Sequence, residues 1–443
     1  MDQVSLGGPR TYGDGAPRPR RPADDDGASA RARTAILERA VARADAAGDH
    51  QVAIDGRRRL ADDHCAAGRW DLAFPLLSAC LRRHDRYADA LGPAVDHDLC
   101  EWAAGLLPRL AEFPQVGLPQ LDRALEDLAR RWGSGPDGLR RLYQAQLTVG
   151  RVTGDWAIEE RYFELWCALG GPRPGRAGDL ELMIERLVLR GDPQSVAQGL
   201  ELAEPALAGR VTLDRPMVGV TCLLALPLAR AGALHLARAL ADTALRKVGQ
   251  PEVGVEVAGH LIEFCALTGD LPNAVDLVGQ RLWAFDGLHR PYGLLEFATA
   301  AAVLGRQVID AGHAGHLLGA GPAAVPVEDL LRRAVATATD LAARFDARNG
   351  NDHHGTRVRA RLAAAPLPVP VRRPLRAPAR AGPPAAAPPA TGPASTASTA
   401  PTAPAAPAAS AAPGRSTTLE QPAPRIRAER SRIARWWRRH PQP

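Results

Sequence analysis

The chain has 443 residues, of which 46% are hydrophobic and 23% charged, with a formal net charge of +6. That length exceeds one ordinary compact domain, which indicates a multidomain chain or a repeat architecture. The six cysteines form no CxxC pair, no signal-peptide pattern follows the start, and no apolar stretch reaches membrane-spanning length. We therefore expect a reduced, cytoplasmic protein, and we do not expect a disulfide-rich secreted scaffold or an integral membrane protein.

The positive charge is concentrated at one end of the sequence. Residues 366–443 hold twelve arginines and two glutamates, a net charge of +10, whereas residues 1–32 are neutral. The remaining 333 residues, 33–365, therefore carry −4. A sequence pI near 9.3 thus reflects a basic tail, and it does not favour a nucleic-acid-binding body.

Composition also divides the chain into four segments. Residues 1–32 are rich in Gly, Pro, Arg and Asp, which predicts a disordered leader. Residues 366–424 contain 16 prolines among 59 residues and predict a disordered Pro/Ala-rich linker, partly extended. Residues 425–443 form a basic, tryptophan-containing tail that could be a short amphipathic helix. Residues 33–365 are the predicted folded body.

Apolar residues in the body recur at intervals of three and four, as in Leu121, Leu125 and Leu128, and alternating strand patterns are nearly absent. The sequence therefore predicts an all-α fold. Glycines 154, 191, 232, 269 and 305 are separated by 37, 41, 37 and 36 residues. We interpret them as left-handed helix ends, often followed by an aspartate that starts the next helix. This period predicts an α-solenoid of about seven to eight helical hairpins with disordered termini.

Several of these turns share the pattern Gly-x-(aromatic or Leu)-x-x-Ala. The instances are Gly68, Trp70, Ala73; Gly232, Leu234, Ala237; and Gly269, Leu271, Ala274. By these residues the chain resembles tetratricopeptide (TPR) repeats across residues 33–365, best at 54–83 and 255–285, although most units exceed the usual length of about 34 residues. Stretches such as HLIEFCALTGD also resemble uncharacterised TPR-type proteins of high-GC actinobacteria. The resemblance implies a fold and no particular activity.

The best candidates for contact with a partner are aromatic residues on the predicted helices. Trp156, Phe163 and Trp166 form one stripe of a helix, with Tyr162 four residues before Trp166. Such a stripe either packs against the neighbouring hairpin or lines a peptide groove, where rigid aromatic side chains are good anchors. The candidate groove residues are Trp70, Trp102, Trp156, Tyr162 and Trp166.

A second candidate contact lies in the tail, where Ile426, Ile433 and Trp437 fall on one helical face. The candidate contact residues there are Arg425, Arg427, Arg430, Arg432, Arg435, Trp436, Trp437, Arg438 and Arg439. Such a peptide could bind an anionic membrane surface, an acidic protein or nucleic acid. It could equally be a solvated basic end, since a helix this short is marginal in water.

Metal-capable residues are concentrated at 62–101, where Cys80 with His84, and His97 with Cys100, have the spacing of zinc ligand pairs. The paired thiols of structural zinc sites are missing, and a cysteine in an alanine-rich helix is usually a small core residue. We therefore assign no metal. For the same reason Cys167, Cys222 and Cys265 are expected in the core, and the pair His353 and His354 is interpreted as a solvated polar turn.

The sequence contains no nucleophile-elbow, P-loop, dinucleotide-binding or zinc-protease motif. We therefore expect neither an enzyme, nor a cofactor, nor a small-molecule substrate. The favoured function is a protein-protein interaction scaffold or adaptor, which holds a protein or peptide in the solenoid groove and uses the tail as a second contact. The alternative is a regulatory protein whose tail contacts nucleic acid or an anionic membrane, which would place it peripherally at the membrane. A metal-dependent enzyme or sensor using His84, Cys80, His97 and Cys100 is a third hypothesis.

Overall fold

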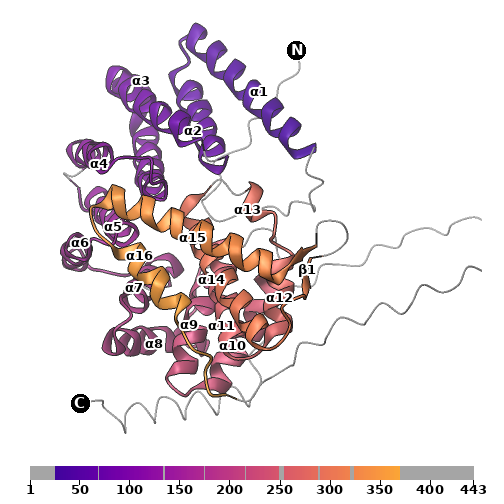
Figure 1. The fold of residues 1–443 in the computed structure, drawn as a ribbon. Coiled ribbons are helices and arrows are strands. Elements are labelled where there is room, and N and C mark those ends of the chain that lie inside the picture. The colour runs from indigo at the N-terminus through magenta and orange to yellow at the C-terminus, as the bar shows by residue number, and fades with distance from the viewer. Residues whose placement is uncertain are drawn as a thin grey trace, which may run out of the picture.

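The computed structural model describes residues 25–67, 69–132, 135–173, 175–214, 216–248, 254–287, 290–319 and 324–369 (Figure 1). The predictions for most of the leader, for nearly all of the linker and for the whole basic tail, including its arginines and tryptophans, lie outside these residues. So does Gly68, the first residue of the first TPR-like turn.

The fold is all-α, apart from one small antiparallel pair of strands. The helices are α1 (Asp25–Ala47), α2 (His50–Ala66), α3 (Trp70–Ala111), α4 (Leu118–Trp132), α5 (Pro136–Thr153), α6 (Trp156–Ala168), α7 (Ala177–Arg190), α8 (Pro193–Leu207), α9 (Val218–Arg230), α10 (Leu234–Val248), α11 (Val255–Leu267), α12 (Leu271–Gly279), α13 (Ala284–Gly287), α14 (Pro291–Asp310), α15 (Val327–Asn349) and α16 (His353–Leu362). The strands β1 (Leu317–Leu318) and β2 (Val325–Pro326) pair Leu317 with Pro326.

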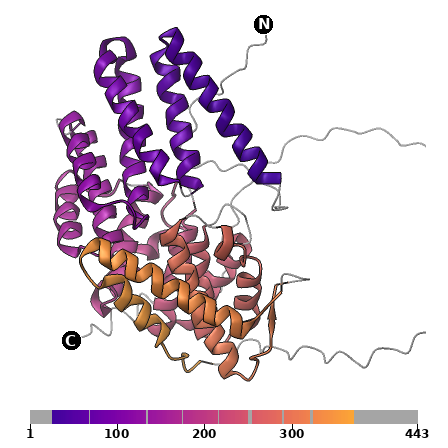
Figure 2. The same ribbon diagram turned by 45° about the horizontal axis from the view of Figure 1, so that its top comes forward.

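The helices form successive hairpins, as the sequence predicts for a helical repeat. Helix α5 packs on α6, α7 on α8, α9 on α10, and α11 on α12. The first helices also touch one another along the chain, since α3 contacts α5, α7 contacts α9, and α9 contacts α11, which contacts α14. The result is a row of first helices backed by a row of second helices, which curves from α3 to α14 (Figure 2).

The predicted helix ends are confirmed at most of the repeating glycines. Gly154 and Gly191 have φ of +74° and +78°, the left-handed conformation that glycine adopts without a Cβ penalty. Asp155 and Asp192 then accept backbone N–H groups at the start of α6 and α8. The turns of these two hairpins are therefore set by a local Gly-Asp pair that can be read from the sequence.

Two expectations about the helices are wrong. Gly305 does not end a hairpin but lies inside α14, where a Cβ would be 3.1 Å from the Leu331 Cβ of α15. Gly305 therefore allows two helices to approach closely, and the turn comes later, at Gly312 with φ of +84°. The body also begins earlier than residue 33, because α1 starts at Asp25.

Helix α3 is broken rather than continuous. Its backbone leaves helical geometry at Tyr87 and at Gly92, where φ is +70° and ψ is +165°. The break precedes Pro93, which disfavours a helical conformation in the residue before it. Both parts of α3 nevertheless contact α2, since the Cys80 thiol lies 3.7 Å from the Ile54 carbonyl and the Trp102 indole donates to Asp62 at 3.3 Å.

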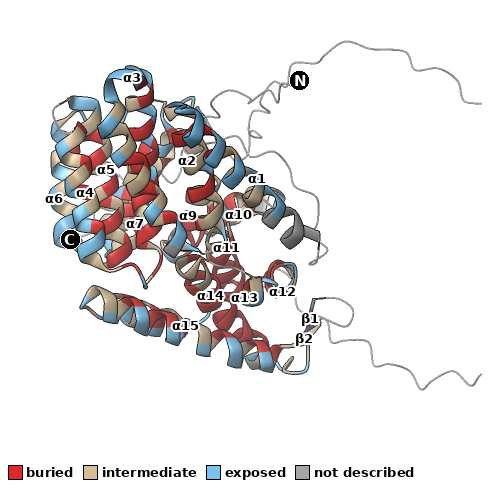
Figure 3. Ribbon diagram, turned by 90° about the horizontal axis from the view of Figure 1, so that it is seen from above, coloured by how far each residue is buried: buried red, intermediate tan, exposed pale blue. Residues whose placement is uncertain are grey.

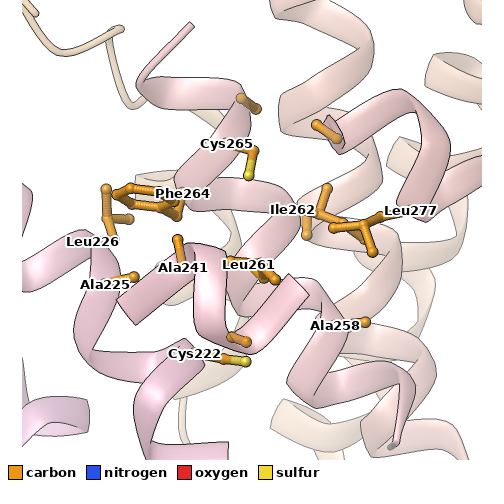
Figure 4. Close-up of a cluster of buried hydrophobic side chains, with 14 of the residues drawn as sticks. Cys222, Ala225, Leu226, Ala241, Ala258, Leu261, Ile262, Phe264, Cys265 and Leu277 are labelled. Atoms are coloured by element: carbon orange, nitrogen blue, oxygen red, sulfur yellow. The ribbon is translucent and has the colours of Figure 1, made fainter. Parts of the chain in front are cut away.

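Buried apolar side chains form two main cores. One spans α2 to α5 and the other spans α7 to α15 (Figure 3). Cys222 and Cys265 lie inside the second core, as expected, beside Ala225, Phe264 and Leu277 (Figure 4). Burial raises the pKa of the Cys222 thiol to about 12, so this cysteine acts as a small apolar residue.

The two cores meet at a polar boundary between the hairpins α5–α6 and α7–α8, which we call the seam. Asp179 accepts a hydrogen bond from Gln144 at 2.8 Å and pairs with buried Arg140, and Arg151 pairs with Glu185 at 2.6 Å. On α6, buried Glu159 lies 2.9 Å from the Arg186 Nε. Ion pairs therefore hold together two hairpins whose apolar cores are separate.

The last helices close the structure by long-range contacts. Figures 1 and 2 show α15 and α16 against the row of first helices. At the C-terminal end of α15, Arg348 donates hydrogen bonds to three backbone carbonyls. These belong to Ala111, the last residue of α3, and to Phe113 and Val116 in the segment after it. At the start of α14, Arg290 pairs with Glu112 at 2.7 Å. The solenoid is thus tied back on its own N-terminal half.

Candidate functional site

The candidate site is built around α16, which crosses the C-terminal ends of the first helices. Asp346 of α15 accepts the backbone N–H groups of His354 and Gly355, both at 2.8 Å, and so starts α16. The His354 Nε2 lies 2.9 Å from the carbonyl of Val152, and Asn351 donates to the carbonyl of Thr153 at 2.9 Å. Helix α16 therefore satisfies carbonyls that the end of α5 would otherwise leave free.

Two arginines one turn apart on α16 hold it to the row of first helices. Arg357 lies 2.7 Å from Glu296 of α14, and Arg361 lies 2.7 Å from Glu263 of α11 and 2.8 Å from Glu296. Burial alone would raise the pKa of Glu296, but the two guanidinium groups hold it well below its usual range. Glu296 is therefore ionised and lies between two guanidinium groups.

A cavity of about 620 Å³ opens beside α16, and we call it the α16 cavity. Its walls come from the turn between α5 and α6, the ends of α7 and α9, the middle of α11, and the start and one side of α16. The apolar part of the lining is Trp156, Val188, Leu189, Leu223, Leu226, Pro227 and Ala360. The α16 cavity borders the seam, since Trp156 belongs to the hairpin on one side and Val188 to the hairpin on the other. Its size and its place between two packed units are those of ligand-binding pockets.

Charged groups lie around this apolar lining. Four arginines line the α16 cavity, and three of them are paired: Arg357 and Arg361 as above, and Arg190 with Glu159 and Glu160 of α6. Arg230, in the last turn of α9, is exposed and has no ion-pair partner among the described residues. The α16 cavity thus combines an apolar wall with one unneutralised guanidinium.

Two aromatic rings meet at the edge of the α16 cavity. The Trp156 indole packs edge-on against the His353 imidazole, with ring centroids 5.4 Å apart, and the Arg190 guanidinium lies 5.9 Å from the indole centroid. Burial, followed by the nearby Arg357, lowers the pKa of His353. His353 is therefore neutral at pH 7 and presents an uncharged ring beside the indole.

The structure separates the five aromatic residues that the sequence singles out for a groove. Trp156 lines the α16 cavity. Trp102 and Trp166 are 1% and 0% exposed, so both lie in the interior. The prediction that they line a groove is therefore wrong. Trp70 packs against the first core, and Tyr162 lies beside Tyr143, with centroids 5.8 Å apart and away from α16.

Two other expectations change. His353 and His354 are not in a solvated turn, because His354 is buried in the contact between α16 and α5. Cys167 is exposed rather than in the core. Cys80 is buried with its thiol 3.7 Å from the Ile54 carbonyl, whereas His84 lies 3.2 Å from Asp96. Within the described residues no group of three or more His, Cys, Asp or Glu side chains has the geometry of a metal site.

Sequence reasoning missed the charged residues of the α16 cavity: Arg190, Arg230, His260, Arg357 and Arg361. A partial signal was present, since Arg357 and Arg361 are four residues apart on a short helix that follows a polar turn. Arg190 and Arg230 each precede a predicted helix end, where a basic residue is common. Their convergence depends on the path of α16, which no local pattern encodes.

Comparisons with known proteins add little to this geometry. Searches against protein-family models and against curated proteins give no match. Among solved structures, the chain is similar to a circular tandem repeat protein with novel repeat topology and enhanced subunit contact surfaces, at 14% identity and a TM-score of 0.20. That match covers 74% of this chain and 81% of the other. A TM-score this low does not establish a shared fold, so the architecture rests on this chain's own helices and contacts.

Across the part of the chain that the structure describes, none of the helices combines the length and the apolar character needed to cross a bilayer.

Proposed function

We propose that this protein is a non-enzymatic interaction scaffold or adaptor of the TPR-like type, which binds a protein or peptide at the α16 cavity. The observation that carries the proposal is the position of Trp156, a rigid aromatic side chain at the edge of a cavity of about 620 Å³ that has an apolar wall. Buried aromatic anchors dominate the energetics of many protein interfaces.

The rigidity of the cavity walls supports this proposal. Asp346, Arg357 and Arg361 fix α16 at both ends, and the glycine turns fix the ends of α5 and α7. A preorganised site loses little conformational entropy on binding. The groups around the α16 cavity include three ion-paired arginines, the exposed Arg230 and the neutral ring of His353, an arrangement suited to recognition.

The basic tail is the proposed second contact, with an acidic protein or another anionic surface. Its charge of +6 at residues 425–439 is opposite to the −4 of residues 33–365. The Pro/Ala-rich linker expected from the sequence at residues 366–424 would tether the tail to the body. A weak tail contact would then gain from the high effective concentration that the tether provides. A cytoplasmic location, peripheral at a membrane if the tail binds lipid, fits this proposal.

The experiment is co-purification from native cytosol with four baits: the full chain, the chain ending at Val369, Trp156→Ala and Tyr162→Ala. Truncation at Val369 keeps the backbone bond from Leu367 to the Leu267 carbonyl. We expect a protein that the full chain, the truncated chain and Tyr162→Ala recover equally, and that Trp156→Ala loses. Thermal unfolding of each bait controls for loss of structure.

Two outcomes contradict the proposal. Recovery that is unaffected by Trp156→Ala would exclude the α16 cavity as the binding site. Recovery of nothing except tail-dependent nucleic acid or lipid would favour the regulatory alternative, in which binding weakens steeply with salt.

A further inference from the structure

Two arginines attach α16 to α11 and α14 by contacts that withstand mild acid. Arg357 lies 2.7 Å from Glu296, and Arg361 lies 2.8 Å from Glu296 and 2.7 Å from Glu263. Although burial opposes its charge, the two guanidinium groups hold the pKa of Glu296 well below its usual range. This carboxylate is therefore still ionised at pH 5, and we expect this side of α16 to stay attached there.

The start of α16 is attached differently, to the hairpin α5–α6 on the other side of the seam. The His354 Nε2 lies 2.9 Å from the Val152 carbonyl at the end of α5. The His353 ring packs edge-on against the Trp156 indole, with ring centroids 5.4 Å apart. Two adjacent histidines therefore make contacts that arginines make at the other end of the helix.

The surroundings of His354 fit only a neutral imidazole. The residue is 1% exposed, and its Nδ1 is buried without a hydrogen-bond partner, so the ring donates from Nε2 and carries no proton on Nδ1. Phe345 of α15 and Tyr292 of α14 pack around the ring, with centroids 4.9 Å and 6.0 Å away. A second proton would create a charged N–H group without an acceptor, which a buried site strongly disfavours.

The charged groups near His354 do not offset this cost. The titratable groups around the ring are Arg151 of α5, Tyr292 and Glu296 of α14, Asp346 of α15, and Asp352, His353 and Arg357 at the start of α16. Burial lowers the pKa of His354, and His353 and Arg357 lower it further. Glu296 acts in the opposite direction but is already paired with two arginines. Asp346 accepts two backbone N–H groups at the start of α16.

We infer that α16 is an acid-released strap: protonation of His354 detaches its first turn from the end of α5, while Arg357 and Arg361 keep the rest of it on α11 and α14. Release separates His353 from Trp156 and so opens the α16 cavity on the side of the hairpin α5–α6. The contacts of α15 with the end of α3 join a guanidinium to backbone carbonyls, so they remain. The inference goes beyond the proposed function and is tested without a partner.

The test is hydrogen exchange of the full chain, measured by mass spectrometry at pH 7.5 and pH 5 and corrected for intrinsic exchange rates. With a pKa of 6.5 in the released strap and about 3 in the closed one, His354 should increase the released population about 30-fold between these pH values. Protection factors in the first turn of α16 should fall by that amount. Exchange there should depend little on urea, because local release exposes little surface, whereas exchange in α14 should rise steeply with urea.

Two variants assign the effect to one histidine. His354→Gln keeps a donor for the Val152 carbonyl and does not titrate, so the fall in protection should shrink from about 30-fold to about threefold or less. His316→Gln is the matched control, since burial also lowers the pKa of His316, which precedes β1 and lies away from α16 (Figure 1). This variant should show the same fall as the wild type.

Three results would overturn the inference. The first is equal protection of the start of α16 at both pH values, and the second is a fall that His354→Gln leaves unchanged. The third is exchange in α16 with the rate and urea dependence of α14, which would mean that the strap leaves only when the whole protein unfolds. The first and third are measured on the wild type, so they do not depend on how well a variant folds. A partner lost with Trp156→Ala would support the proposed function whichever result is found.

Discussion

Arg348 donates a hydrogen bond to the carbonyl of Ala111 at 3.0 Å, although the two residues are 237 positions apart. The same guanidinium reaches the carbonyls of Val116 at 3.1 Å and Phe113 at 3.3 Å. Burial lowers the pKa of Arg348 to about 10, because no carboxylate compensates for its desolvation. One arginine thus takes the place of a helix cap at the end of α3 and joins the two ends of the solenoid.

Arg348→Met should lower the free energy of unfolding by about 2–3 kcal/mol, since it removes the donors of three carbonyls while it keeps an apolar stem. Arg348→Lys should recover part of the loss, because an ammonium group cannot reach three carbonyls in fixed fork geometry. Urea denaturation measures both. A change below about 0.5 kcal/mol for Arg348→Met would show that the closure contributes nothing to stability.

Glu296→Gln should lower the free energy of unfolding by more than Arg348→Met does. It removes the carboxylate that pairs with both Arg357 and Arg361. Removing one partner of a buried ion pair costs about 3–5 kcal/mol. Glu256→Gln is the matched control: Glu256 lies 3.3 Å from Arg290, which keeps its closer partner Glu112, and its expected cost is below about 1 kcal/mol.

The effect of Glu296→Gln should also depend on pH. The pKa of Glu296 lies well below its usual value of about 4.5, so its contribution is complete above that pH and falls as the pH drops below it. The difference between wild type and Glu296→Gln in urea denaturation should therefore be smaller at pH 3.5 than at pH 7. An equal difference at both values would contradict the ionised, paired state of Glu296.

The sequence was sufficient to predict the repeating units, because each is specified locally. Gly154 and Asp155, like Gly191 and Asp192, end one helix and begin the next within a few residues. Gly305 misled the prediction because its spacing is that of a turn, while its role is to let α14 approach Leu331.

The candidate site could be predicted only in part. Trp156 was identified as a candidate groove residue, but Trp166, which lies on the same predicted helix stripe, is fully buried. The difference arises from tertiary contacts, since the Arg140 guanidinium lies over the Trp166 ring at 5.0 Å. The path of α16 depends on contacts such as His354 with Val152, which are about 200 residues apart and leave no periodic signal.

His354 should make stability depend on pH in the mildly acidic range. Burial lowers the pKa of His354 from 6.5 to about 3. Between pH 6.5 and pH 3, the imidazole is therefore protonated in the unfolded chain and neutral in the folded protein. Stability should therefore fall as the pH drops below 6.5, by up to about 1.4 kcal/mol per pH unit for one such group.

His354→Gln should flatten this dependence between pH 6.5 and 5, because glutamine does not titrate and keeps an N–H donor for Val152. The free energy of unfolding of the variant should still fall with pH, but less steeply, because burial also lowers the pKa values of His260 and His353. Urea denaturation at half-unit pH steps provides the comparison. A slope identical to that of the wild type would exclude His354 as a titrating group in this range.

Gly154→Ala and Gly191→Ala form a matched pair that tests whether α16 is seated on the end of α5. Both glycines have positive φ, so alanine at either position costs about 1 kcal/mol of backbone strain. A Cβ at Gly154 would also lie 2.4 Å from the His353 Cγ, whereas a Cβ at Gly191 would meet nothing within 4 Å. Gly154→Ala must therefore displace His353 or its helix.

We expect Gly154→Ala to lower the free energy of unfolding by at least about 1 kcal/mol more than Gly191→Ala does, since the displaced ring gives up its packing against Trp156. Thermal and urea denaturation measure the difference, and hydrogen exchange localises it, with faster exchange expected in α16 for Gly154→Ala only. Equal losses, with α16 equally protected in both variants, would mean that the contact between His353 and the end of α5 does not form in solution.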